Sequence, residues 1–99
     1  MQIIYEYHDV SASERLEAMA KEKLENLSKK YDFVHRADVF FKTENRSDEE
    51  NMFCDIRLSM PGPRIFASSN ADNFEAALSE TIRDLEHQLR KVKEKLSAH

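Results

Sequence analysis

The stretch Asp72–Leu96, DNFEAALSETIRDLEHQLRKVKEKL, decides the fold of this chain. Its aliphatic side chains recur at intervals of three and four, the spacing of one helical face; they are Leu78, Ile82, Leu85, Leu89, Val92 and Leu96. Asp72 followed by Glu75 fits a capping box, and neither Gly nor Pro interrupts the run as far as His99. The sequence therefore predicts a helix about 40 Å long, with an apolar stripe that needs a cover.

A second amphipathic segment lies nearer the N-terminus. Ser11 with Glu14 fits a capping box, and the predicted helix runs from there to about Lys30. Its apolar stripe consists of Leu16, Ala20, Leu24, Leu27 and Tyr31. This helix also carries a single apolar face, so it needs the same kind of cover as the first.

The remaining segments alternate with a period of two, which is typical of half-buried strands. The predicted strands are Gln2–His8, Arg36–Glu44, Met52–Met60 and the shorter Arg64–Ser69. The polar and acidic segment Asn45–Asn51 predicts a hairpin loop, and Pro61-Gly62-Pro63 predicts a turn.

The predicted order of elements is β-α-β-β-β-α. Because a helix joins the first two strands, these strands are parallel if they are neighbours, whereas the short later connections make antiparallel pairs. Two helices with one apolar stripe each are best covered by the same sheet face. We therefore expect an α+β two-layer sandwich, a four-stranded mixed sheet with both helices packed on one face, forming a single domain over residues 1–99.

Several classes of function lack their usual residues. Cys54 is the one cysteine and the four histidines show no ligand spacing, so no metal site is expected. A single glycine excludes Gly-rich phosphate loops, and no nucleophile motif is present. We therefore expect no enzyme, no cofactor and no small-molecule substrate. No apolar run approaches the ~20 residues of a membrane span, and the first residues do not form a signal peptide, so a cytoplasmic protein without a membrane partner is expected.

Charge is distributed unevenly along the chain, whose net charge is −4. Residues 21–42 hold six basic and four acidic side chains, and residues 83–99 hold five basic and three acidic ones, while the other segments are acidic. Basic side chains on the two helices allow two interpretations. They form either solvated faces with local pairs, such as Glu25 with Lys29, or a surface that binds a polyanion.

A second candidate surface is the sheet face that the helices leave open. Alternation places Phe40 and Phe53 on this face, where they would form an exposed apolar patch for a protein partner. Asp38 and Asp55 share the face, and we expect them to be exposed carboxylates that serve solubility. A protein–protein interaction module is therefore the alternative to a polyanion-binding protein.

Motifs along the whole chain resemble the bacterial ribosome hibernation-promoting factors, the protein Y, ribosome-associated inhibitor or sigma-factor modulation group. The resemblance rests on the opening MQI, on KEKLENL in the first helix, and on the Pro-Gly turn that leads into IFASS. It rests further on DNFEAAL and on DLEHQLRKVKEK in the second helix. The chain is similar to the short form of the family, which has no second, dimerising domain.

The resemblance implies a translation repressor of stationary phase and stress. Such a protein binds the small ribosomal subunit between head and body, where it sterically blocks the messenger RNA channel and the tRNA sites. It also implies that a ribosome modulation factor is a possible second partner, because short forms act with one in other bacteria.

The resemblance also implies which side chains contact ribosomal RNA phosphates. Lys23, Lys29, Lys91 and Lys95 match family positions. Helical projection adds Lys30, Arg83 and Arg90 beside them. His87 completes the candidate set; like Asn26 and Asp84, it stands where relatives often have a basic residue. We expect the cations of both helices to converge on one RNA-facing ridge, with contacts that are independent of sequence and sensitive to salt.

Overall fold

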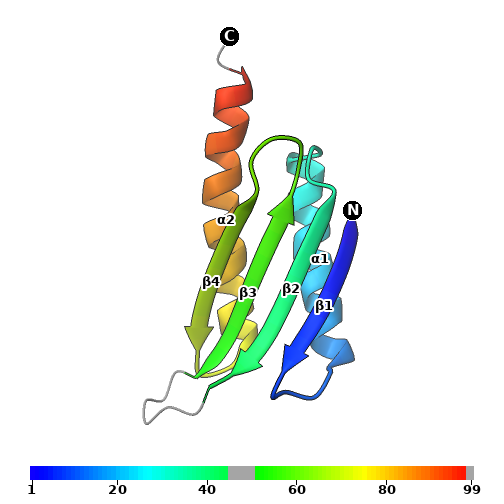
Figure 1. Ribbon diagram of the computed structural model, residues 1–99, viewed down its shortest axis with the longest axis vertical. Helices are drawn as coiled ribbons and strands as arrows, with labels where there is room; N and C mark the ends of the chain where they lie inside the picture. The colour runs from blue at the N-terminus through cyan, green and yellow to red at the C-terminus, as the bar shows by residue number, and fades with distance from the viewer. Residues whose placement is uncertain (45–50, 98–99) are drawn as a thin grey trace.

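The computed structural model describes residues 1–44 and 51–97, which form four strands and two helices (Figure 1). The elements, in chain order, are β1 (Gln2–His8), α1 (Glu14–Lys30), β2 (Arg36–Thr43), β3 (Met52–Ser59), β4 (Ile65–Ala71) and α2 (Phe74–Ser97). The predicted order of elements is therefore confirmed.

The sheet is mixed and its spatial order is β1-β2-β3-β4. β1 and β2 are parallel, as the α1 crossover requires, and the β2–β3 and β3–β4 pairs are antiparallel. Both helices lie side by side against one face of this sheet, as Figure 1 shows. The α+β two-layer sandwich predicted from the sequence is confirmed.

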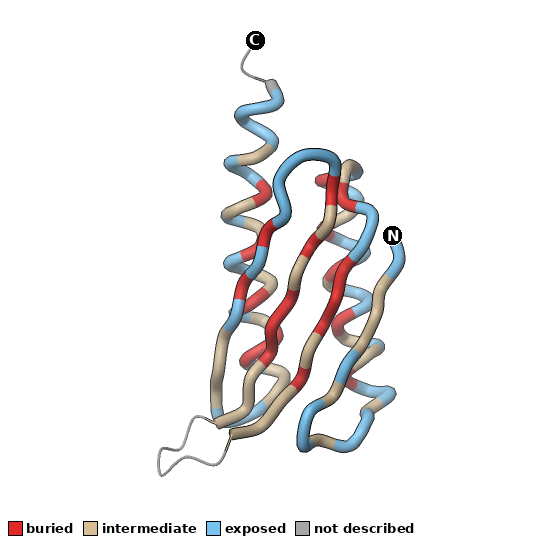
Figure 2. Tube along the Cα trace, in the orientation of Figure 1, coloured by how far each residue is buried: buried red, intermediate tan, exposed pale blue. Residues whose placement is uncertain are grey.

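The core lies between the helices and the covered sheet face. The predicted stripe of α1 is buried, and so are Leu78, Leu85 and Leu89 of α2. Alternate residues of the central strands meet them, and Figure 2 shows these buried positions along β2 and β3. Phe41 is fully buried, stacks on Tyr7 of β1 at 5.7 Å between ring centroids, and meets Phe74 of α2 edge-to-face at 5.6 Å. One side chain thus joins β1, β2 and α2.

Both helices begin slightly later than predicted. The N-cap of α1 is Ser13, not Ser11, because the Ser13 backbone is extended and its Oγ accepts the amide of Leu16 at 3.2 Å. At α2, the Oδ1 atom of Asn73, not Asp72, accepts the amide of Ala76 at 2.8 Å. Neither predicted capping box forms.

Other boundaries change by one or two residues. β2 and β3 each end one residue earlier than predicted, and β4 runs from Ile65 to Ala71 instead of 64 to 69. The predicted apolar stripe of α2 ends at Val92, because the helix continues past the sheet and leaves Leu96 58% exposed (Figure 1). The predicted hairpin loop falls largely on residues 45–50, which lie outside the described residues.

Cys54 is buried, as predicted for a small apolar side chain. Burial raises the pKa of its thiol to about 12, and a hydrogen bond with Thr81 acts in the opposite direction. The hydroxyl of Thr81 also lies 2.7 Å from the Cys54 carbonyl oxygen, linking α2 to β3. The thiol therefore stays protonated and serves packing, without reactive chemistry.

The β3–β4 connection is the predicted turn. Gly62 has a φ of +93°, which non-glycine residues rarely adopt, and Pro61 precedes it in the arrangement of a type II turn. This turn lies at the same end of the molecule as the start of β2 and the last turns of both helices (Figure 1).

The molecule is a short rod of 49 × 25 × 18 Å whose two ends differ in charge. We call the end with the β3–β4 turn the basic end, because its cations outnumber the carboxylates of Asp32, Asp38 and Glu94 there. These described cations are Lys29, Lys30, Arg36, Arg57, Arg64, Arg90, Lys91, Lys93 and Lys95. Acidic side chains gather at the opposite end, which includes Asp9, Glu14, Glu17, Asp72, Glu75 and Glu80. The segmental charge pattern of the sequence thus becomes a charge difference along the long axis.

Candidate nucleic-acid interface

One flank of α2 faces α1 across two ion pairs. Arg15 Nη2 lies 3.1 Å from Glu75 Oε1, and Lys30 Nζ lies 3.0 Å from Glu86 Oε2. Lys93 Nζ donates to the backbone carbonyl of Lys30 at 3.2 Å. These three contacts identify the flank of each helix that faces the other helix.

A shallow groove of about 160 Å³ opens between the helices. It is lined by Lys23, Asn26, Leu27 and Lys30 of α1 and by Ile82 and Glu86 of α2. Two of the predicted cations, Lys23 and Lys30, therefore share one groove and could flank a phosphate there. Glu86 competes for this position because it already pairs with Lys30.

Three predicted residues of α2 face solvent: Arg83, His87 and Arg90 are all exposed. Arg83 Nη1 lies 3.7 Å from Glu80 Oε1, so its charge is partly compensated. Lys29 is exposed near the end of α1.

Lys91 and Lys95 occupy the other flank of α2, away from α1. The side-chain amide of Gln88 donates to the backbone carbonyl of Phe66 at 2.9 Å, so this flank faces β4. Lys91 and Lys95 follow Gln88 by three and seven residues and therefore lie along the same flank. Both side chains are exposed, and among the described residues neither makes an ion pair.

The eight predicted residues thus form a wider surface than one ridge. Lys23 and Lys30 of α1 lie in the groove between the helices, and Lys29 is exposed near the end of α1. On α2, Arg83, His87 and Arg90 lie on the solvent side, and Lys91 and Lys95 lie on the β4 side. Carboxylates partly neutralise Lys30 and Arg83. Among the described residues of the set, Lys29, Lys91 and Lys95 are exposed and are not paired with a carboxylate.

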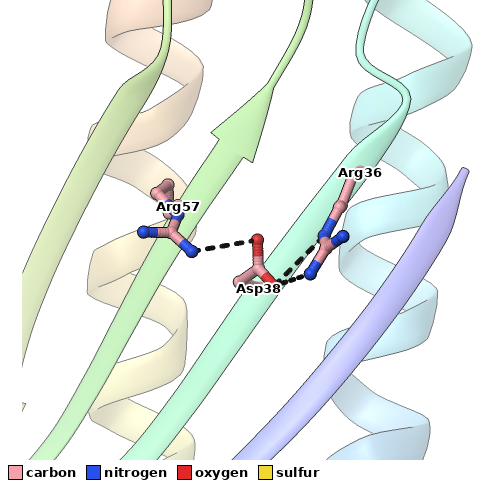
Figure 3. Close-up of polar contacts among 3 residues, drawn as sticks. All are labelled: Arg36, Asp38 and Arg57. Carbon is pink, nitrogen blue, oxygen red and sulfur yellow. Dashed lines mark hydrogen bonds and ion pairs between the residues drawn. The ribbon is translucent and has the colours of Figure 1, made fainter.

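The two carboxylates of the open sheet face are buried, contrary to the expectation from the sequence. Asp38 is 5% exposed and Asp55 is 9% exposed, so neither is a solvated surface group. Asp38 accepts from Arg36 at 3.0 Å and 3.2 Å and lies 3.6 Å from Arg57, as Figure 3 shows. Lys42 lies 3.3 Å from Asp55. The carboxylates are buried because cations from the same and the neighbouring strand pair with them.

The aromatic residues of this face are also arranged differently. Phe40 and Phe53 are half-buried, and the ammonium of Lys42 lies 5.3 Å from the centroid of the Phe53 ring. The exposed ring is Phe66 of β4, which is 53% exposed. Sequence reasoning missed Phe66 because the short β4 segment gives no clear alternation. The strand register places Phe66 on the open face, because it is the cross-strand partner of Arg57, which lies on that face.

Residues 1–44 and 51–97 contain neither a metal-ligand cluster nor a membrane-spanning helix. No three His, Cys, Asp or Glu side chains come together there as a metal site. No helix in these ranges combines the length and apolar character needed to cross a membrane.

Comparison with known proteins assigns the chain to a family. The family described as sigma 54 modulation protein / S30EA ribosomal protein matches residues 3–97, nearly the whole sequence. The chain belongs to this family. Its members are ribosome-associated modulation proteins, a non-enzymatic class, which agrees with the resemblance found in the sequence.

Solved structures show how far the S30EA family fold is shared. A ribosomal subunit interface protein from Coxiella burnetii has a TM-score of 0.83 at 22% identity, covering 94% of this chain and 98% of its own. The N-terminal domain of protein Y from Thermus thermophilus has a TM-score of 0.79 at 17% identity, covering 93% and 99%. No curated protein sequence matches the chain. At these identities the two structures establish a common fold.

Proposed function

We propose that this protein binds the small ribosomal subunit and represses translation by occupying the messenger RNA and tRNA sites. The lysine and arginine side chains of the two helices would contact ribosomal RNA phosphates in the cytoplasm, in stationary phase and under stress. The observation that carries the proposal is the basic end, which an S30EA family member presents despite its net charge of −4.

The exposed lysines of α2 are the strongest phosphate ligands in this proposal. Lys91 and Lys95 are exposed and make no ion pair within the described residues, so phosphate contacts displace no carboxylate. Lys23 offers a third contact from the groove, and Lys29 and Arg90 extend the same end. Such contacts fix position on RNA without reading its sequence. Repression would then follow from occupancy, with no bond made or broken.

A salt series with purified small subunits tests the proposal. With roughly four phosphate contacts, affinity should fall on the order of 100-fold between about 50 and 200 mM salt, because each contact releases condensed counterions. Co-sedimentation measures this fall. Subunits preloaded with messenger RNA and tRNA should retain less protein than empty ones. A salt-independent affinity would instead favour a protein partner on the open sheet face, and equal binding to preloaded subunits would exclude blockade. Adding a ribosome modulation factor to the same assay tests the second partner.

Neutralising Glu86 is expected to tighten subunit binding. Glu86→Gln removes the carboxylate that holds Lys30 at 3.0 Å and leaves that ammonium available in the groove. Because an exposed pair contributes less than about 1 kcal/mol, we expect affinity to rise about 3-fold. The matched control is Glu14→Gln, an equal charge change at the acidic end. Equal affinities of the two variants would show that the groove does not contact RNA.

A further inference from the structure

The open sheet face carries an arginine cluster at the basic end. Strand register places Asp38 directly between Ile4 and Arg57, with Arg36 two residues along the same strand. Arg36 and Arg57 share this one carboxylate, whose side chain is 8% exposed, whereas the arginine side chains are 46% and 43% exposed (Figure 3). The cluster has two positive charges and one negative charge. Its outer N–H groups therefore remain available to a phosphate.

Asp38 also holds the arginines in place. Both the Nε and the Nη2 atoms of Arg36 donate to Asp38 Oδ1, and Arg57 approaches Oδ2 from the neighbouring strand. A carboxylate buried in the sheet thus orients two guanidinium groups before any ligand arrives. Pre-ordered side chains lose less conformational entropy on binding than free surface arginines.

An exposed aromatic ring lies beside this cluster. Phe66 is the direct cross-strand partner of Arg57 and is 53% exposed. Its backbone carbonyl is held by Gln88 of α2, so the ring stands on a fixed strand. Phe40 follows in the next row of the same face, between Glu6 and Asp55. Aromatic rings next to cations on an open sheet are the usual platform for unpaired nucleotide bases.

A hollow of about 290 Å³ adjoins Phe40. Its lining residues on the open face are Glu6, His8, Phe40, Lys42 and Asp55. Tyr7 and Phe41 also line it, but their rings stack on each other on the covered face. The hollow places the Phe40 ring near the carboxylate of Glu6, an acceptor for the amino groups of a base. The Asp55 carboxylate is already held by Lys42 and Ser68. A phosphate site, a stacking ring and a polar hollow therefore follow one another across the sheet.

We propose that the open sheet face binds single-stranded RNA, with phosphate at Arg36 and Arg57 and bases stacked on Phe66 and Phe40. Positive charge alone would also suit an acidic peptide. The exposed ring beside the arginines favours RNA, because an acidic peptide has no need of a stacking surface. This surface lies opposite the helices and does not depend on the proposed helix contacts with the ribosome.

Tryptophan fluorescence provides a direct test. The chain contains no tryptophan, so Phe66→Trp introduces a single reporter on the proposed platform. Stacking of a base on this ring should quench its fluorescence when an oligouridylate of about 12 nucleotides is added. Leu96→Trp, at another exposed apolar site near the basic end, is the matched control. Equal quenching at both positions, or none at position 66, would overturn the proposal.

Affinity measurements with a labelled oligouridylate supply the second test. Phe66→Ser should weaken binding about 10-fold and Arg57→Gln several-fold, within the range for one stacked base or one phosphate contact. Arg15→Gln and Leu96→Ser remove the same kinds of side chain elsewhere and should leave affinity unchanged. Wild-type affinity of both sheet variants would overturn the proposal.

Competitors decide the class of ligand. A duplex RNA of equal length should compete poorly, because its bases are not free to stack. Equal competition by the duplex contradicts the stacking platform. Equal competition by an oligoglutamate of matched charge would assign the face to an acidic peptide and overturn the proposal. Since no ribosome is present, failure of this experiment leaves the sedimentation test of the proposed function intact.

Discussion

Replacement of both Lys91 and Lys95 by glutamate is expected to weaken binding to the small ribosomal subunit about 100-fold or more. Each substitution removes a proposed phosphate contact and places a negative charge beside the RNA. A 100-fold loss corresponds to about 2.7 kcal/mol shared between two positions. Both side chains are exposed on the β4-facing flank of α2, so stability should change by less than about 0.5 kcal/mol. Co-sedimentation and thermal unfolding together measure these two effects.

Comparison of two single substitutions separates the loss of a phosphate contact from the effect of net charge. Lys95→Glu and Lys21→Glu change the charge of the protein equally. The carboxylate of Glu17 accepts a hydrogen bond from the hydroxyl of Tyr7, so this flank of α1 faces β1. Lys21 follows Glu17 by one helical turn and therefore lies on the same flank. Lys95→Glu should reduce pelleting strongly and Lys21→Glu only slightly. Equal losses would indicate attraction by overall charge and would remove Lys95 from the interface.

Replacement of Phe41 by alanine is expected to reduce the free energy of unfolding by about 3–5 kcal/mol. The ring is fully buried between Tyr7 and Phe74, so its removal leaves a cavity where β1, β2 and α2 meet. The free energy of unfolding of a small domain is about 5–15 kcal/mol, so this substitution would remove a large part of it. Urea titration followed by circular dichroism measures it.

Two further variants keep this prediction testable if Phe41→Ala does not fold. Phe41→Leu retains most of the apolar volume and should lose clearly less stability. Phe66→Ala removes the same ring from a site that is 53% exposed and should change stability by less than about 0.5 kcal/mol. If Phe66→Ala were as damaging as Phe41→Leu, the assignment of the covered and open sheet faces would be wrong.

The fold could be predicted because each long element carries a complete apolar pattern. The stripe of α1 from Leu16 to Tyr31 and the strand alternation around Val39 and Ile56 survive in the structure as buried residues. The caps were predicted less well, because Ser11 and Ser13, or Asp72 and Asn73, are chemically similar. An N-cap contributes about 1 kcal/mol, so local sequence alone hardly separates such neighbours.

The charged sites depended on contacts between elements distant in sequence. Lys30 meets Glu86 only because the two helices pack side by side, and no spacing within either helix indicates that pair. Likewise, Asp38 is buried because the β2–β3 register brings Arg57 opposite it. Periodicity placed the eight candidate residues on the two helices but did not show that they spread over a surface wider than one ridge. Their ion-pair partners on the other helix could be identified only from the way the helices pack.

The charge difference between the two ends has a consequence for how the protein reaches a polyanion. Attraction at one end and repulsion at the other exert a torque on the rod during diffusion, so encounters begin with the β3–β4 turn and the helix termini leading. Productive collisions then become more frequent without any added contact in the final complex. Since the Debye length is about 8 Å at physiological ionic strength, salt should slow arrival more than it hastens departure.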